Sequence, residues 1–278
     1  MSGAAPVLSE VRDQTAWITL NRPRHANVQN GAMLYALDRA FYDAVEDDAV
    51  KVIVLRGAGP HFSGGHDIGT AERDADQYFD RRASLWWSHV GDTGASARMA
   101  REEDLYLGLC RRWRDLPKPT IAMVHGACIA GGLMLAWVCD LIVAAEDATF
   151  RDPVVSMGIP GVEYFAHPWA LGSRVAREFL YTGDAIDGRR AYEIGMVNRV
   201  VPADQLEEAT SQLAQRIADK PRFGLALTKK ALNSAEDHMG LRAGMDTAFA
   251  LHHVAHSHNA ETMGDSLAGV TAKAIKAS

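Results

Sequence analysis

Three short runs of β-branched and other apolar residues along the chain each have the length of a buried strand. They cover residues 17–20, 52–55 and 120–124, and each ends near glycine or another turn-forming residue. Between the first two, apolar side chains recur at helical spacing over 31–45, at Met33, Leu34, Leu37, Phe41 and Val45. The order strand, helix, strand predicts an α/β architecture.

The pattern changes along the chain, which suggests how it is organised. The segment 69–104 is rich in charged and aromatic residues without one clean period, and we interpret it as helical pieces that form a flap over a pocket. Prolines at 117 and 119 stop the preceding element directly before a strand. From 204 onward the spacing of apolar residues is helical throughout. We therefore expect a core over 1–203 and a helical lobe over 204–278.

Composition narrows the function classes. The chain has 278 residues, 47% of them hydrophobic, which is enough for one large core with or without a lobe. The net charge of -6 provides no global basic field for nucleic acid or anionic lipid. The three cysteines are widely spaced and form no CxxC pair, and the N-terminus shows no basic segment followed by an apolar run. The apolar runs are far shorter than the roughly 20 residues of a membrane span. These features favour a reduced, cytoplasmic protein.

Two glycine-containing turns follow predicted strands, over 61–68 and 126–136. In the second, Gly131 and Gly132 precede an apolar helical run, so amide donors without acceptors at the helix start would suit an anionic oxygen. Two loops that each lend one amide could stabilise a developing oxyanion. The alternative is that both turns only allow close packing of strands and helices.

The order and spacing of several short motifs resemble the crotonase (enoyl-CoA hydratase/isomerase) superfamily over roughly 10–235. These motifs lie at 21–23, 62–68, 118–126, 131–132, 139–140 and 180–183. The resemblance implies a crotonase-like spiral of repeated strand-strand-helix units with a C-terminal helical lobe. It also implies that this lobe is used to form a homotrimer, often within a dimer of trimers.

The same resemblance implies an enzyme acting on an acyl-CoA thioester, with coenzyme A as part of the substrate and neither a cofactor nor a metal. The backbone amides of His66 and Gly131 would polarise the thioester carbonyl, and the His66 imidazole either enters the pocket or points away. Lys229 would approach the CoA phosphates of a neighbouring subunit, or lie on a solvated helix face. Further substrate contacts are expected from Gly65, Asp67, Ile68, Gly132, Met134 and Val154.

The sequence departs from the hydratase pattern at both catalytic glutamates, because Met134 and Val154 occupy their positions. Hydration needs one group to activate water and another to deliver a proton, so an ordinary two-glutamate hydratase is not expected. We expect Glu163 to be the main acid/base, unless it is only a helix-start carboxylate. His167, four residues on, would share a helix face with it, unless it is a packed histidine; Asp152 is a weaker third candidate.

His252 and His256 lie four residues apart on a predicted helix, as metal ligands often do. No acidic residue stands at the HExxH spacing, so we expect these histidines to fill an oligomer interface rather than to bind a metal.

Three functions remain open from the sequence. The first is an enoyl-CoA hydratase/isomerase-like lyase or isomerase of the type used in fatty acid metabolism. The second is a CoA-independent retro-Claisen hydrolase of a cyclic diketone, because His167 and Trp169 resemble residues of such relatives. The third is an acyl-CoA binder without catalysis, motivated by the loss of both glutamates.

Overall fold

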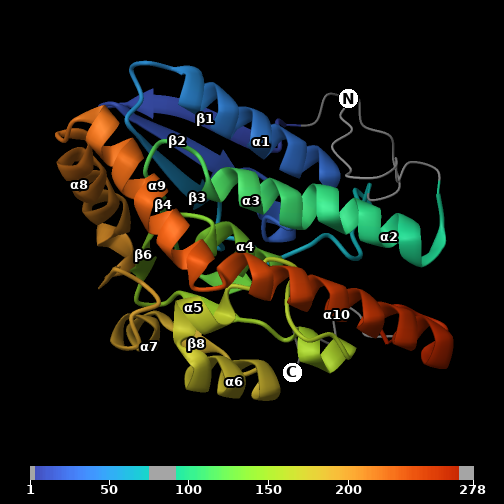
Figure 1. Cartoon of the computed structure of the whole chain (residues 1–278). Coiled ribbons are helices and arrows are strands. Elements are labelled where there is room, and N and C mark those ends of the chain that lie inside the picture. Colours follow the sequence, from blue (N-terminus) through green and yellow to red (C-terminus); the bar gives the residue numbers. More distant parts are fainter. Residues whose placement is uncertain (1–3, 75–91, 269–278) are drawn as a thin grey trace.

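The computed structural model describes residues 4–74 and 92–268 and is built around a six-stranded sheet, most of whose strands are labelled in Figure 1. The strand order is β1-β2-β3-β4-β6-β9, with β1 antiparallel to β2 and the other pairs parallel. The bounds are β1 Val7–Arg12, β2 Thr15–Leu20, β3 Val52–Gly57, β4 Thr120–Val124, β6 Leu141–Ala145 and β9 Arg199–Val201. The three predicted strands are thus confirmed, and so is the helix between the first two, α1 (Gly31–Glu46).

A second, three-stranded sheet has the order β5-β7-β8, with bounds Ala127–Ile129, Thr149–Arg151 and Ile186–Asp187. The chain alternates between the sheets: β4 is followed by β5 and then α4 (Gly131–Trp137), and β6 by β7. β8 and α7 (Gly188–Glu193) then lead back to the large sheet at β9. The predicted spiral of strand-strand-helix units is confirmed.

Both faces of the large sheet are buried, which explains why its strands read as continuous apolar runs. Side chains of alternate residues point to opposite faces. Trp17, Val52 and Val54 pack against α8 (Leu206–Ala218), whereas Ile53 and Leu55 face the main core. The first helix of the predicted C-terminal lobe therefore packs directly on the core sheet.

The structure describes six further α-helices. They are α2 Gly94–Glu102, α3 Leu109–Arg114, α5 His167–Leu171, α6 Ser173–Thr182, α9 Arg222–His238 and α10 Leu241–Met263. A π-helical turn, η2 (Glu103–Gly108), joins α2 to α3, and 3-10 turns cover Pro23–His25, Val154–Met157 and Ala203–Gln205. Much of the predicted flap, 75–91, lies outside the described residues. The described part of the flap includes α2, which contacts α10.

Within 4–74 and 92–268, none of the helices has both the length and the apolar character that crossing a membrane requires.

Candidate active site

A cavity of about 270 Å³ lies where segments distant in the sequence meet. It is lined by the loop after β3, by α2 and η2, by the turn before α4, by the 153–163 segment and by α10. The titratable side chains that line it are His66, Asp67, Arg73, Arg98, Arg101, Glu102, Tyr106, Glu163, His252 and His256.

The His66 side chain enters this cavity and pairs with Glu163. Nε2 of His66 lies 3.0 Å from Oε2 of Glu163, whose side chain is only 4% exposed. The imidazole stacks on the ring of Tyr106, with centroids 3.7 Å apart and planes 16° from parallel. Its Nδ1 is buried and has no hydrogen-bond partner among the described residues. Of the two orientations left open by the sequence, the structure has the inward one.

The charge of Glu163 follows from this pairing. Burial alone would raise its pKa, but the attraction and the hydrogen bond of His66, together with the attraction of His252, hold the pKa at about 2. Glu163 is therefore a carboxylate that accepts a hydrogen bond near neutral pH. It can orient the His66 ring and stabilise a positive charge on it.

Gly131 makes room for the His66 ring. A Cβ atom on Gly131 would lie 2.6 Å from Cε1 and 2.8 Å from Nδ1 of His66, so a larger residue would push the imidazole away. Gly65, at φ +97°, brings the other loop so close that a Cβ there would lie 3.2 Å from the Gly131 nitrogen. Ala130, between β5 and α4, has the strained angles φ 48° and ψ -115°. The two loops therefore meet with their glycines in contact.

The backbone amides of His66 and Gly131 both lack an acceptor among the described residues. His66 lines the cavity, whereas Gly131 is not among the lining residues and lies against the His66 ring. This arrangement leaves two donors close to the imidazole.

The other residues expected at the substrate divide into two groups. Asp67, Ile68 and Val154 line the cavity, but Gly132 and Met134 do not, because both are buried by packing against other parts of the core. The Asp67 carboxylate is already bound by Arg22, at 2.9 Å, and by Thr70. Burial alone would raise the pKa of Asp67, but the hydrogen bonds from Thr70 and Arg22 outweigh this effect and lower it. Asp67 therefore holds its loop in place.

Lys229 lies away from the cavity and is not on a solvated face. Its ammonium group is buried, 2.9 Å from Oδ2 of Asp140, and donates to the carbonyl of Lys118 at 3.1 Å. Within this chain, both groups hold it in a structural role, so its predicted contact with CoA phosphates has no support in this structure.

The structure does not bring His167 to Glu163. The prediction assumed a helix through both residues, but 161–166 are not helical and α5 begins only at His167. Nε2 of His167 lies 2.8 Å from Oδ2 of Asp152, and both side chains are fully buried. The imidazole packs against the rings of Trp137 and Phe165. His167 and Asp152 thus form a buried pair that is not among the residues lining the cavity, and the prediction that His167 shares a helix face with Glu163 is wrong.

We expect His167→Ala to destabilise the protein without removing activity. Losing a packed ring and leaving Asp152 without its partner should lower the free energy of unfolding by about 3 kcal/mol. Urea unfolding measures the loss, and turnover is then assayed at a temperature at which the variant is folded. If turnover by the folded variant were reduced a hundredfold or more, His167 would have a role in catalysis.

Sequence reasoning missed Glu102 and Tyr106 and misplaced His252 and His256. Both histidines are buried inside this chain and line the cavity, so the prediction that they fill an oligomer interface is wrong. Burial would lower the pKa of His252, but the neighbouring carboxylates of Glu102 and Glu163 raise it to about 9. The spacing of the histidines was a signal, but their acidic neighbour lies on α2, far away in sequence.

Comparison with known proteins gives a consistent result. The model of the family described as enoyl-CoA hydratase/isomerase matches residues 10–94 and 92–268. A Mycobacterium tuberculosis protein named as an enoyl-CoA hydratase, EchA13, is 44% identical over 91% of this chain and 80% of its own. The 1,2-epoxyphenylacetyl-CoA isomerase of Escherichia coli is 32% identical over 83% and 82%. A Mycobacterium smegmatis crystal structure described as an enoyl-CoA hydratase has a TM-score of 0.84 at 42% identity, covering 95% and 98%.

Proposed function

This chain belongs to the enoyl-CoA hydratase/isomerase family, and from that premise we propose that it forms an enolate from an acyl-CoA thioester and moves a proton through His66 and Glu163. The observation that carries the proposal is the 3.0 Å contact between Nε2 of His66 and Oε2 of Glu163, with Nδ1 of the same ring left without a partner. A base held by a carboxylate on one side has its other nitrogen free for a substrate.

The chemistry assigns each group one role. With Nε2–H donated to Glu163, Nδ1 of His66 carries a lone pair and can remove a proton from the carbon next to the thioester carbonyl, or, in a 2-enoyl thioester, from the carbon directly beyond the double bond. The electrons of the broken C–H bond pass to the carbonyl oxygen. The amides of His66 and Gly131 are the donors that would bind this oxyanion. Returning the proton to a different carbon shifts the double bond.

We infer isomerisation rather than hydration as the reaction. Hydration requires a second group that activates water, and Met134 and Val154 stand where the family resemblance places the two glutamates. One hydrogen-bonded pair can collect and return a single proton. The E. coli relative that is named an isomerase acts on a CoA thioester, which supports this choice. Arg73, Arg98 and Arg101 line the cavity and supply positive charge suited to an anionic substrate.

Two measurements test the proposed function. In D2O, we expect deuterium to enter the carbon next to the thioester carbonyl of an acyl-CoA, detected by mass spectrometry. A panel of 2-enoyl- and 3-enoyl-CoA thioesters of differing length and branching should then show double-bond movement without addition of water. Tight acyl-CoA binding with neither exchange nor isomerisation would instead indicate an acyl-CoA binder without catalysis. Cleavage of a cyclic diketone would indicate a retro-Claisen hydrolase.

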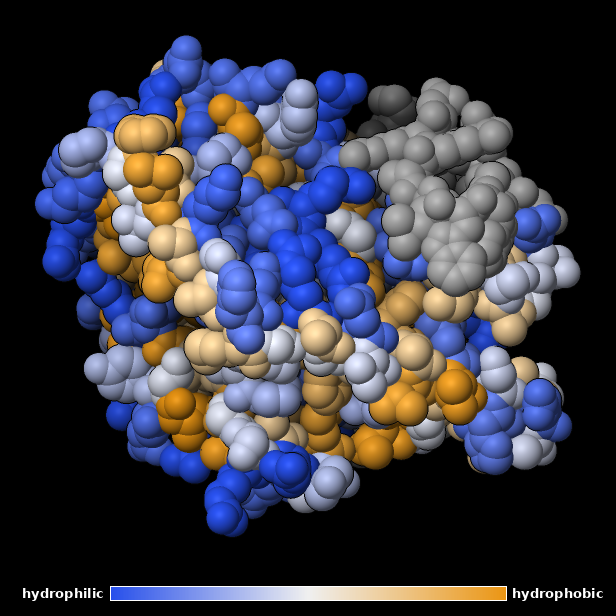
Figure 2. Space-filling view, viewed as in Figure 1, coloured by the Kyte–Doolittle hydropathy of each residue, from blue (hydrophilic) through white to orange (hydrophobic). Residues whose placement is uncertain are grey.

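We also propose a homotrimer, or a dimer of trimers, supported by apolar side chains left exposed on α9. Phe223 is 75% exposed, Leu227 50% and Leu232 61%, and Figure 2 shows apolar side chains on the surface in the region of this helix. Light scattering should give three or six times the mass of the chain, and Phe223→Asp should lower that mass. A monomer at micromolar concentration would contradict the proposal.

A further inference from the structure

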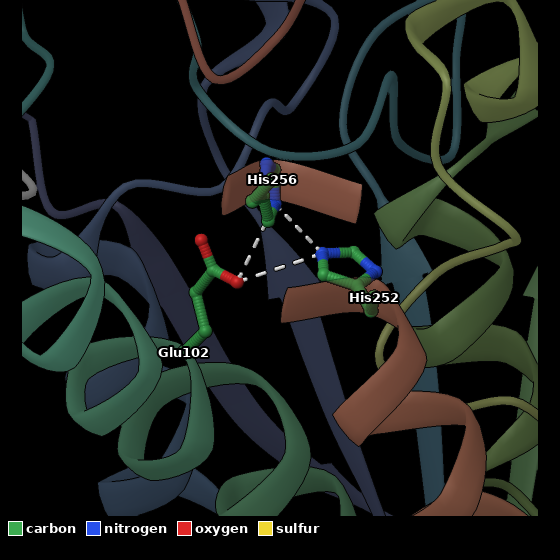
Figure 3. A group of neighbouring side chains, drawn as sticks. All are labelled: Glu102, His252 and His256. Carbon is green, nitrogen blue, oxygen red and sulfur yellow. Dashed lines mark hydrogen bonds and ion pairs between the residues drawn. The ribbon is translucent and has the colours of Figure 1, made fainter. Parts of the chain in front are cut away.

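Three side chains at one end of the cavity converge on a common point. Glu102 ends α2, and His252 and His256 lie one turn apart on α10; Figure 3 shows all three pointing toward one another. Oε2 of Glu102 lies 3.5 Å from Nε2 of His252 and 3.7 Å from Nε2 of His256. The two Nε2 atoms are 2.9 Å apart. All three residues are buried.

The outer nitrogens of both rings are already bound to backbone oxygens. Nδ1 of His252 lies 2.9 Å from the carbonyl oxygen of Gly161, and Nδ1 of His256 lies 2.9 Å from that of Ser266. A carbonyl oxygen accepts, so each Nδ1 carries a hydrogen and each neutral ring then has its lone pair on Nε2. If both rings were neutral, their two lone pairs would face each other at 2.9 Å, so either a proton on one of the rings or a metal ion must lie between or beside them.

The separations match the ligand set of a metal ion. An ion about 2.1 Å from each ligand places tetrahedral ligand atoms about 3.4 Å apart. The three observed separations, 2.9, 3.5 and 3.7 Å, lie around this value. Histidines that bind metals usually donate their second nitrogen to a carbonyl or carboxylate, as both rings do here. Oε2 of Glu102 is buried and has no hydrogen-bond partner among the described residues.

From these contacts we propose that Glu102, His252 and His256 bind one divalent transition-metal ion, with Zn²⁺ as the best match. Two imidazoles and one carboxylate suit Zn²⁺ and its first-row neighbours rather than Mg²⁺ or Ca²⁺, which take oxygen ligands. The ion would tie α2 to α10 and offset the buried negative charges of Glu102 and Glu163.

The proposed ion would face the cavity. The three ligands line it together with Glu163, whose Oε1 lies 3.8 Å from Nε2 of His252. A three-ligand site leaves a fourth position for Glu163, for water or for a ligand in the cavity. Nε2 of His253 is also 3.3 Å from Oε2 of Glu102, so this histidine is a possible additional ligand that the test must include.

The test measures metal binding by the whole chain without a polyhistidine tag, after treatment with a chelator. Calorimetric titration with Zn²⁺ should give one ion per chain, and Co²⁺ should produce visible absorption bands of the intensity typical of tetrahedral coordination. Zn²⁺ should also raise the melting temperature. His252→Ala, His256→Ala and the more conservative Glu102→Gln should each weaken Zn²⁺ binding at least about tenfold.

Two further variants serve as comparisons. His258→Ala removes an exposed histidine from the same helix and should leave binding unchanged. His253→Ala shows whether a fourth side chain contributes. Binding that resists the His252, His256 and Glu102 substitutions, or no binding above that of surface histidines, would overturn the proposal and leave a pair of histidines that share a proton. Because no acyl-CoA is present in these titrations, their outcome is separate from that of the proposed function.

Discussion

Replacing Glu163 by glutamine is expected to lower kcat/KM for deuterium exchange into acyl-CoA by about a thousandfold, within the range typical of general acid/base catalysis. Glutamine keeps the size of the side chain but removes the charge that stabilises a protonated His66. Its NH2 group can also donate a hydrogen bond to Nε2 of His66, which moves the ring hydrogen to Nδ1. The ring would then present the wrong tautomer to the substrate. Glu163 acts through His66, so the loss should fall on kcat, while the dissociation constant for acyl-CoA changes little.

The comparison variant for this experiment is Glu193→Gln, which neutralises an exposed carboxylate paired with Arg190. It should retain the activity of the unmodified chain. If the folded Glu163→Gln protein also exchanged deuterium at the full rate, Glu163 would have no part in proton transfer.

His66→Ala is expected to cost at least as much, about a thousandfold to ten-thousandfold in kcat/KM, because it removes the group that takes the proton. It also leaves space beside Gly131 and Tyr106, against which the ring now lies. Imidazole added to the solution should occupy that space and restore part of the exchange. The measurement is the exchange rate as a function of imidazole concentration.

His66→Phe provides the matching control, because phenylalanine can keep the stacking on Tyr106 but cannot carry a proton. It should remain folded and inactive, without restoration by imidazole. Substantial exchange by His66→Phe would assign the proton to another group in the cavity.

The sequence predicted the parts of the fold that depend on local pattern. The buried runs became β2, β3 and β4 because both faces of the sheet are covered, and the apolar stripe over 31–45 became α1. The family motifs placed His66, Ile68, Val154 and Glu163 at one cavity. These predictions needed only periodicity, glycine positions and motif order.

The pairing of Glu163 with His167 failed for a local reason that the sequence also contained. Four-residue spacing brings side chains together only on a helix. Pro168 lacks a backbone N–H and therefore fits the first turn of a helix, where it marks the start of α5 at His167, and Gly161 adopts φ +157°, which L-residues rarely do. The chain between them is therefore irregular, and His167 turns toward Asp152.

The grouping of Glu102 with His252 and His256 could not be predicted from local pattern. About 150 residues separate Glu102 from His252 along the chain, and only the contact of α2 with α10 in the folded protein brings the carboxylate to the two imidazoles. Such long-range contacts leave no trace in periodicity. The four-residue spacing of the histidines indicated a shared face but not what that face meets.

The exchange rates of His66→Ala, Glu163→Gln and the double variant together test the central claim, that the two residues move one proton as a unit. Residues that act as a unit have strongly non-additive effects. We expect the double variant to be no slower than the slower single variant. Losses that multiply in the double variant would mean that the two side chains act independently, and the account of a single His66–Glu163 proton carrier would be wrong.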